Sequence, residues 1–248
     1  MSRDTNKSST VLKAFRVLEA VAEMPEPGTA PEVAKFAGIE RVTTYRMLRT
    51  MEEAGYLEMD PAAKTYRVSR RILSLAKPLI EDGPDRRNIS ELLKAVSKRT
   101  GETCHFSELS GIETVLTQRV KGSQLVAVDF RIGTRCELHA TSVGKAILAH
   151  QSPEFIDDYV MLDLKGYTTK TLTLKEQLLE ELETIRQSGI SYDFEELSNG
   201  MNCVAVPVRS QFGGIEAGIS ISGPSNRLDR ARLAELGQIM REEIANLA

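Results

Sequence analysis

One segment near the N-terminus, residues 29–69, constrains the fold of this 248-residue chain most strongly. It begins with "TAPEVAKFAG", in which Thr29 and Glu32 have the spacing of a capping box at the start of a helix. Gly38 suits the C-terminal end of that helix, and a second helix is expected from about residue 41 to 54. Two short helices joined by a tight turn that contains glycine form the helix-turn-helix pattern.

A further helix is expected before this pair and a hairpin after it. Apolar residues follow helical spacing from about residue 10 to 23, and Ser8 or Ser9 can cap the start of that helix. Short alternating runs at 56–59 and 65–69 flank "DPAAK", in which Asp-Pro favours a turn. Three helices followed by a β-hairpin make up the winged form of the helix-turn-helix.

The helix expected at residues 41–54 has a buried face and an exposed face. Helical spacing assigns four residues to the buried face: Thr44, Met47, Leu48 and Met51. The exposed face carries Arg41, Val42, Tyr45, Arg46 and Arg49, with Thr43 near the helix start. Arginine binds guanine or phosphate, and hydroxyl groups bond to phosphates or base edges, so this face suits the major groove of DNA. The alternative is a solvated face with ion pairs such as Arg49 to Glu53.

Charge is distributed unevenly along the chain. The whole chain has a net charge of −3, but residues 1–75 carry +2 and the remainder carries −5. This excess is weak evidence for DNA binding unless the basic groups share one face. The chain is 41% hydrophobic and 27% charged, which is an ordinary globular balance. No apolar run approaches the ~20 residues that span a bilayer.

The cysteines and the N-terminus indicate the compartment. The three cysteines lie far apart and include no CxxC pair, so neither a disulfide framework nor a zinc site is expected. The N-terminal "MSRDTNKSST" has no apolar core behind its charges, unlike a signal peptide. We therefore expect a cytoplasmic protein without a membrane segment, a metal or a cofactor.

The remainder of the chain predicts a second domain of the α+β class. Pro78 and "EDGPDRRN" mark residues 70–88 as a helical linker. Strands are predicted at residues 103–109, 113–120, 124–130, 190–193, 201–209 and 216–222. Helices are predicted at 89–99, from Thr141, from Ser152, from a capping box at Thr173 and Glu176 to Ser188, and from Asp229 onward. Strands grouped at both ends of a helical insert favour a mainly antiparallel sheet.

The stretch "SVGKA" has some features of a phosphate-binding loop. A Walker A motif needs glycine five residues before the Gly-Lys pair, where this chain has His139, and a Ser or Thr where it has Ala146. Nucleotide binding is therefore not favoured. The N–H groups at the start of this helix, from Thr141 to Gly144, still favour an anion site. The alternative is an ordinary capped helix with Gly144 packed closely on the sheet.

Catalysis has little support in the sequence. Cys203 with His105 or His139 would be the obvious nucleophile pair, but nothing in their spacing brings them together. The three histidines include no HxxxH-type pair, which argues against a metal sensor. We expect a protein that is not an enzyme. The alternative is a ligand-binding or hydrolytic module with a basic, partner-binding N-terminal domain.

Motifs along nearly the whole chain resemble those of the IclR family of bacterial transcription regulators. In "GIERVTTYRMLRTMEEAGYLEMD" and "KTYRVSRRILSLA", eight positions match the family pattern: Gly38, Thr43, Tyr45, Arg46, Leu48, Gly55, Tyr56 and Tyr66. Arg41 stands at the usual lysine and Val42 replaces a small polar residue, which puts the base preference in doubt. The stretches "LHATSVGKAILA" and "GISYDFEELSNGMNCVAVPV" are similar to two signatures of the family's effector domain.

The resemblance implies an N-terminal winged helix-turn-helix domain at residues 1–69, the linker at 70–88 and a GAF-like effector and oligomerisation domain at 89–248. It implies a repressor of a catabolic operon that binds double-stranded operator DNA as a homodimer or homotetramer. The expected DNA-binding residues are Arg41, Val42, Thr43, Tyr45, Arg46, Arg49 and Lys64. The expected effector is a small carboxylic or hydroxy acid. Its expected contacts are Ser142, Val143, Gly144, Asp193, Met201, Cys203 and Cys104.

Overall fold

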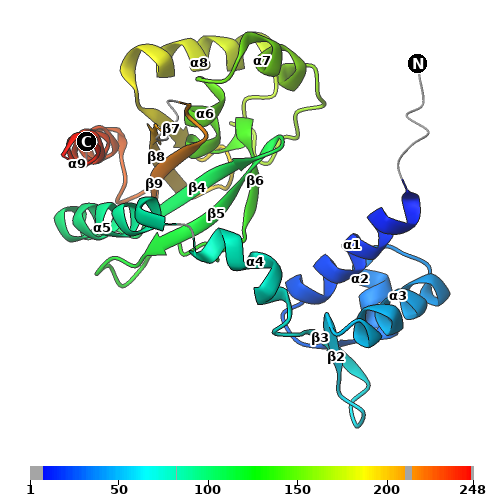
Figure 1. The fold of residues 1–248 in the computed structure, drawn as a ribbon. Coiled ribbons are helices and arrows are strands. Elements are labelled where there is room, and N and C mark those ends of the chain that lie inside the picture. Colours follow the sequence, from blue (N-terminus) through cyan, green and yellow to red (C-terminus); the bar gives the residue numbers. More distant parts are fainter. Residues whose placement is uncertain (1–7, 82, 210–213, 247–248) are drawn as a thin grey trace. The chain divides into compact units, whose positions relative to one another are not determined.

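The computed structural model describes residues 8–81, 83–209 and 214–246 (Figure 1). The chain divides into two compact units, Met1–Asp82 and Gly83–Ala248.

The N-terminal unit is a winged helix-turn-helix, as predicted. Its elements are α1 (Ser9–Glu23), β1 (Gly28–Thr29), α2 (Ala30–Ala37), α3 (Arg41–Glu53), β2 (Leu57–Met59), β3 (Thr65–Val68) and α4 (Ile72–Glu81). The predicted capping box at the start of α2 is confirmed, because the Glu32 carboxylate accepts from the Thr29 N–H at 2.8 Å. Gly38 ends α2 with φ 65°, a left-handed conformation that favours glycine. The short strand β1, which was not predicted, pairs with β3 in a sheet of order β1-β3-β2.

Apolar faces of all three helices and the hairpin meet in one core. Thr44 and Leu48 are fully buried in α3, and Met47 and Met51 pack against the same cluster, so the predicted buried face is confirmed. Leu57 and Tyr66 extend this core into the hairpin. Because one face of α3 is fixed in this core, the opposite face is presented outward.

The C-terminal unit is a six-stranded antiparallel sheet with helices on both faces, as the α+β prediction requires (Figure 1). Its strands are β4 (Cys104–Ser110), β5 (Glu113–Val120), β6 (Arg135–Glu137), β7 (Ser191–Phe194), β8 (Met201–Val208) and β9 (Ala217–Pro224). Their order across the sheet is β6-β5-β4-β9-β8-β7. Its helices are α5 (Gly83–Thr100), the short η1 (Leu138–Ala140), α6 (Ser142–Leu148), α7 (Pro153–Val160), α8 (Lys175–Ser188) and α9 (Arg230–Ala245).

Alternation along the strands separates two layers. Phe106 and Ile221 point to one face, where they pack with apolar residues of α5 and α9 in the larger core. Ala205 points to the other face, where it packs with Val143 and Ile147 of α6. Helices α7 and α8 form a further apolar cluster on that side. The side of the sheet that faces α6 also carries the polar residues of the cavity described below.

Two local predictions were wrong. Residues 124–130 form no strand, because side chains rather than a neighbouring strand bond to their backbone. The Arg119 guanidinium donates to the Phe130 carbonyl and the Arg227 guanidinium to the Val126 carbonyl, each at 2.9 Å. Helix α8 begins after Leu174, whose side chain makes no cap, and not at a Thr173 capping box. Among the described residues, no helix has the length and apolar character needed to cross a bilayer.

Candidate functional site

Helix α3 and the hairpin border a hollow on the N-terminal unit. Arg41, Val42, Tyr45 and Arg49 line it from α3, and Lys64 lines it from the hairpin turn. Val42 is 65% exposed and Tyr45 is 53% exposed, which is unusual for side chains of this size and apolar content. The structure thus brings five of the seven predicted DNA-binding residues to one concave surface. Arg46 lies on the exposed side of α3 outside this hollow.

A glutamate that the sequence reasoning missed caps α3. The Glu40 carboxylate accepts from the N–H groups of Val42 and Thr43, each at 2.9 Å, and from the Thr43 hydroxyl at 2.9 Å. These bonds hold the pKa of Glu40 below its usual range. The Thr43 hydroxyl is therefore engaged within the protein. The sequence signal for this cap was a glutamate three residues before Thr43, at the start of the predicted helix.

The arginines of α3 differ in their partners. Arg49 lies 3.0 Å from Glu52 and 3.9 Å from Glu53, the contact that the alternative interpretation of this face expected. Arg41 and Arg46 are exposed and form no ion pair with another described residue. Arg41 and Arg46 are therefore free to bind an external anion, whereas Arg49 must first leave its glutamates.

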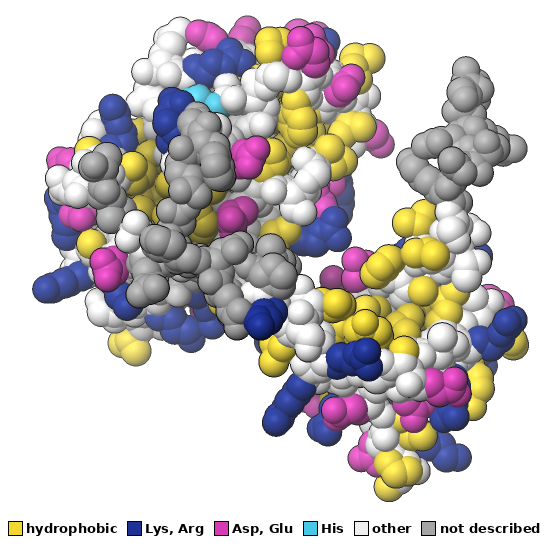
Figure 2. All heavy atoms as spheres, in the orientation of Figure 1, with side chains coloured by type: hydrophobic (Ala, Val, Ile, Leu, Met, Phe, Trp, Pro, Cys, Tyr) yellow, Lys and Arg dark blue, Asp and Glu magenta, His cyan; other side chains and the backbone are white. Residues whose placement is uncertain are grey.

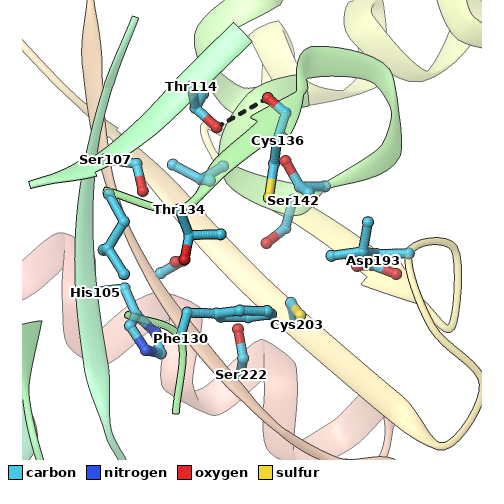
Figure 3. Close-up of a pocket in the computed structure, with 15 residues that line it drawn as sticks. His105, Ser107, Thr114, Phe130, Thr134, Cys136, Ser142, Asp193, Cys203 and Ser222 are labelled. Carbon is cyan, nitrogen blue, oxygen red and sulfur yellow. Dashed lines mark hydrogen bonds between the residues drawn. The ribbon is translucent and has the colours of Figure 1, made fainter. Parts of the chain in front are cut away.

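The C-terminal unit contains a small cavity between the sheet and α6 (Figure 3). Its volume is about 40 Å³, which is room for a few water molecules. Four predicted effector contacts line it: Ser142, Val143, Asp193 and Cys203. The loop between β5 and β6 closes one side with Phe130 and Thr134.

Three predicted contacts do not line the cavity. Cys104 packs in the core with α5 and α9, because it alternates with His105 along β4 and points to the other face of the sheet. Met201 is the first residue of β8, two positions before Cys203, and does not belong to the lining. Gly144 instead packs against η1: a Cβ there would lie 2.4 Å from the Leu138 carbonyl oxygen. Its N–H donates to the Thr141 hydroxyl at 3.0 Å, so the predicted anion site has one N–H fewer.

Residues missed by the sequence reasoning complete the wall of the cavity. They are His105, Ser107, Thr114, Leu116, Phe130, Thr134, Cys136, Leu197, Ser220 and Ser222, and Thr141 of the predicted anion site lines it as well. Alternation in "CHFS" and "ISIS" was the available signal, because every second residue is His or Ser. Two loop residues, Phe130 and Thr134, had no such signal, and Phe130 was assigned to a strand.

Asp193 is the most perturbed acid of the cavity. It is fully buried and pairs across the β7–β8 ladder with Cys203. Its Oδ1 accepts from the Glu196 N–H at 2.6 Å, and its Oδ2 has no partner among the described residues. Burial raises the pKa of Asp193 to about 6. A buried carboxyl with a free oxygen is prepared to bond to a ligand.

Cys203 and His105 both line the cavity, but they lie on strands β8 and β4, which β9 separates. Burial raises the pKa of the Cys203 thiol well above its usual range and lowers the pKa of His105 to about 4. Both groups are thus neutral, the opposite of the thiolate–imidazolium pair that a nucleophile needs. His139 bonds through Nδ1 to the Tyr159 hydroxyl at 3.0 Å, away from the cavity lining. Within the described chain, no three His, Cys, Asp or Glu side chains form a metal-ligand group.

The lysine of "SVGKA" is buried. Lys145 is 1% exposed and its Nζ lies 2.6 Å from Glu196 Oε1 and 3.2 Å from Glu181 Oε1. A lysine held by two carboxylates inside the protein is not available to a nucleotide phosphate. This agrees with the sequence reasoning against a Walker A loop.

Comparisons with known proteins cover both units. The family model "IclR helix-turn-helix domain" matches residues 10–61, and "Bacterial transcriptional regulator IclR C-terminal" matches residues 86–247. The chain is similar to HTH-type transcriptional regulator KdgR of Escherichia coli (strain K12), with 30% identity over 95% of this chain and 89% of that protein. It is also similar to Transcriptional repressor IclR of the same organism, with 27% identity over 95% and 87%.

A solved structure has the same fold. It is an IclR homologue from Microbacterium hydrocarbonoxydans in complex with 4-hydroxybenzoate. The two chains share 23% identity and superpose with a TM-score of 0.77 over 96% of this chain and 97% of the other.

Proposed function

From the premise that the chain belongs to the IclR family of bacterial transcription regulators, we propose that it represses a catabolic operon until a small organic acid binds its C-terminal cavity. The observation that carries the DNA-binding part is the exposed face of α3. Arg41 and Arg46 lie there without an ion-pair partner among the described residues, opposite the buried Thr44 and Leu48.

On operator DNA, α3 enters the major groove with its N-terminal half. Arg41 and Arg46 bind guanine or phosphate, and Tyr45 donates to a phosphate or a base edge. Val42, which is 65% exposed, contacts a thymine methyl group. Lys64 binds backbone phosphate from the hairpin turn. Arg49 joins them once it exchanges Glu52 for phosphate, and Thr43 helps Glu40 to fix the start of the helix.

In the C-terminal unit, the effector occupies the cavity bordered by Ser142, Val143, Asp193 and Cys203. A carboxylic or hydroxy acid is supported by two features: a wall rich in hydroxyl groups and a buried Asp193 with one unpartnered oxygen. A relative of the same fold was solved with 4-hydroxybenzoate, which makes that acid a sensible first probe. Neutral Cys203 and His105 support a binding site and not a catalytic centre.

The assembly is a homodimer or homotetramer in the cytoplasm. Figure 2 shows hydrophobic side chains gathered on the surface of the N-terminal unit over α1. Val11, Leu12 and Phe15 are each more than half exposed on that helix. An apolar surface of this kind favours a protein contact. The functional division is residues 1–69 for DNA, 70–88 for the linker and 89–248 for effector and assembly.

Operator binding is the test of this function. The purified full-length protein is titrated into labelled duplexes from the intergenic regions beside its gene, and fluorescence anisotropy gives the affinity at several salt concentrations. The affinity for one duplex should exceed that for unrelated DNA, and it should fall by about 0.9 log unit per log unit of salt for each phosphate contacted. An affinity that depends neither on the salt concentration nor on the DNA sequence would contradict the proposal. Addition of the effector should then release the duplex.

A further inference from the structure

Two polar side chains in the wall of the cavity have hydrogen-bonding atoms without partners. His105 is 2% exposed, and neither Nδ1 nor Nε2 has a partner among the described residues. Asp193 is fully buried, and its Oδ2 also has no partner among the described residues. Buried polar groups in folded proteins nearly always have a partner, and those that lack one call for an explanation such as a bound ligand.

The two groups lie at opposite ends of the cavity. His105 is on β4 and Asp193 is on β7, which are separated by β9 and β8 in the sheet. Three strand spacings correspond to about 14 Å along the sheet. Both side chains belong to the face that lines the cavity, and Figure 3 shows them on opposite sides of it. A lone ion cannot reach both groups, whereas one molecule with a polar group at each end can.

The chemistry at each end defines what that molecule must carry. Asp193 already uses Oδ1 to accept from the Glu196 N–H, so Oδ2 is the atom left to bond to a ligand. His105 is neutral near pH 7 because burial lowers its pKa to about 4, and a neutral imidazole has one donor and one acceptor nitrogen. Asp129 and Arg119 lie near His105, but they form an ion pair with each other. The Phe130 ring packs edge-on against the imidazole, with 5.7 Å between the ring centroids.

We propose that His105 is a specificity-determining residue of the cavity, and that the effector is a bifunctional hydroxy acid whose two polar ends bond to His105 and Asp193. This rests on the proposed function only in naming the ligand an effector. The cavity of about 40 Å³ is smaller than such an acid, so its walls must move apart when the ligand binds.

Isothermal titration calorimetry of the full-length protein without DNA tests the inference. The aromatic probes are 4-hydroxybenzoate, benzoate and phenol, of which only the first has a polar group at both ends. The aliphatic probes are D-gluconate and hexanoate. We expect the bifunctional member of one series to bind at least about 10-fold more tightly than its monofunctional relatives, since each relative lacks at least one of the two buried hydrogen bonds. Equal binding within both series, or no binding by any probe, would overturn the inference.

Variants assign the effect to His105. His105→Phe keeps the ring but removes both hydrogen-bonding nitrogens, and it should abolish the 10-fold preference for the bifunctional acid. His105→Gln keeps a donor and an acceptor and should restore part of the preference, which a purely structural role would not do. His150→Gln makes the same change at a histidine outside the cavity lining and should bind like the parent. A preference that survives His105→Phe would refute the assignment.

The two proposals fail in different experiments. Calorimetry without DNA reports only on the cavity, whereas release of the operator duplex reports on the regulatory function. A protein that prefers the hydroxy acid but never binds DNA would contradict the proposed function alone. A protein that binds its operator and releases it with an acid that has no second polar group would contradict the inference alone. Circular dichroism of each variant establishes that it is folded.

Discussion

Lys145 and Glu196 form a buried ion pair beside the cavity of the C-terminal unit. The Lys145 Nζ lies 2.6 Å from Oε1 and 2.8 Å from Oε2 of Glu196. The backbone N–H of the same glutamate donates to Asp193 at 2.6 Å. The pair thereby fastens α6 to the segment after β7, and it fixes the position of the cavity's acidic end.

Lys145→Met should reduce the free energy of unfolding of the C-terminal unit by about 3–5 kcal/mol, because it leaves the Glu196 carboxylate buried without its cation. The double variant Lys145→Met with Glu196→Gln should recover a large part of this loss, since no buried charge remains unpaired. Urea unfolding followed by circular dichroism measures both. Losses that simply add in the double variant would mean that the two side chains do not interact.

The Asp193→Asn variant should unfold with a weaker dependence on pH than the parent. The folded-state pKa of about 6 lies above the ordinary value of 3.8, so the neutral acid is favoured by folding. Its contribution is fully present below pH 3.8 and is lost as the pH rises through 6. The expected difference between parent and variant across this window is roughly 2–3 kcal/mol. Parallel stability curves from urea unfolding at pH 4, 5, 6 and 7 would contradict the raised pKa.

Arg46→Ala should weaken operator binding and reduce the slope of log affinity against log salt by about one phosphate contact. Arg49→Ala is the matched comparison and should have a smaller effect, because Arg49 is bound to Glu52 at 3.0 Å before DNA arrives. Anisotropy titrations at several salt concentrations give both slopes. Equal losses for the two variants would show that the internal ion pair does not matter on DNA.

Asp193→Ala should abolish the response to the effector while the ligand-free protein still binds its operator. The reason is that Asp193 lies in the wall of the C-terminal cavity, and the exposed face of α3 belongs to the other unit. Operator release by increasing concentrations of 4-hydroxybenzoate or D-gluconate, compared with the parent, measures the response. If operator affinity without ligand falls by the same factor, Asp193 is a structural residue.

Local signals in the sequence predicted most of the fold. The capping box at Thr29, the left-handed Gly38 and the spacing of Thr44 and Leu48 each act within a few residues, so they can be read without tertiary information. The alternating run at 124–130 led to a wrong strand prediction, because two arginines outside this run, Arg119 and Arg227, bond to its carbonyl groups.

The site was predicted less completely, because it depends on which face of each strand is used. Asp193 and Cys203 were identified through the family resemblance, and they do line the cavity. The predicted contact at Cys104 was wrong by one position, since the neighbouring His105 is the residue that points into the cavity. The partner of Lys145 could not be found either, because Glu196 lies 51 positions further along the chain.

The small cavity sets a threshold for sensing. Under the proposed function, only the fraction of molecules in which the cavity has widened can admit a hydroxy acid, and the apparent dissociation constant is the intrinsic one divided by that fraction. If about one molecule in a hundred is open, the metabolite must accumulate about 100-fold beyond its intrinsic affinity before the operon responds. A tightly closed resting state would thus filter out brief or trace exposure and reserve gene expression for a sustained supply of the nutrient.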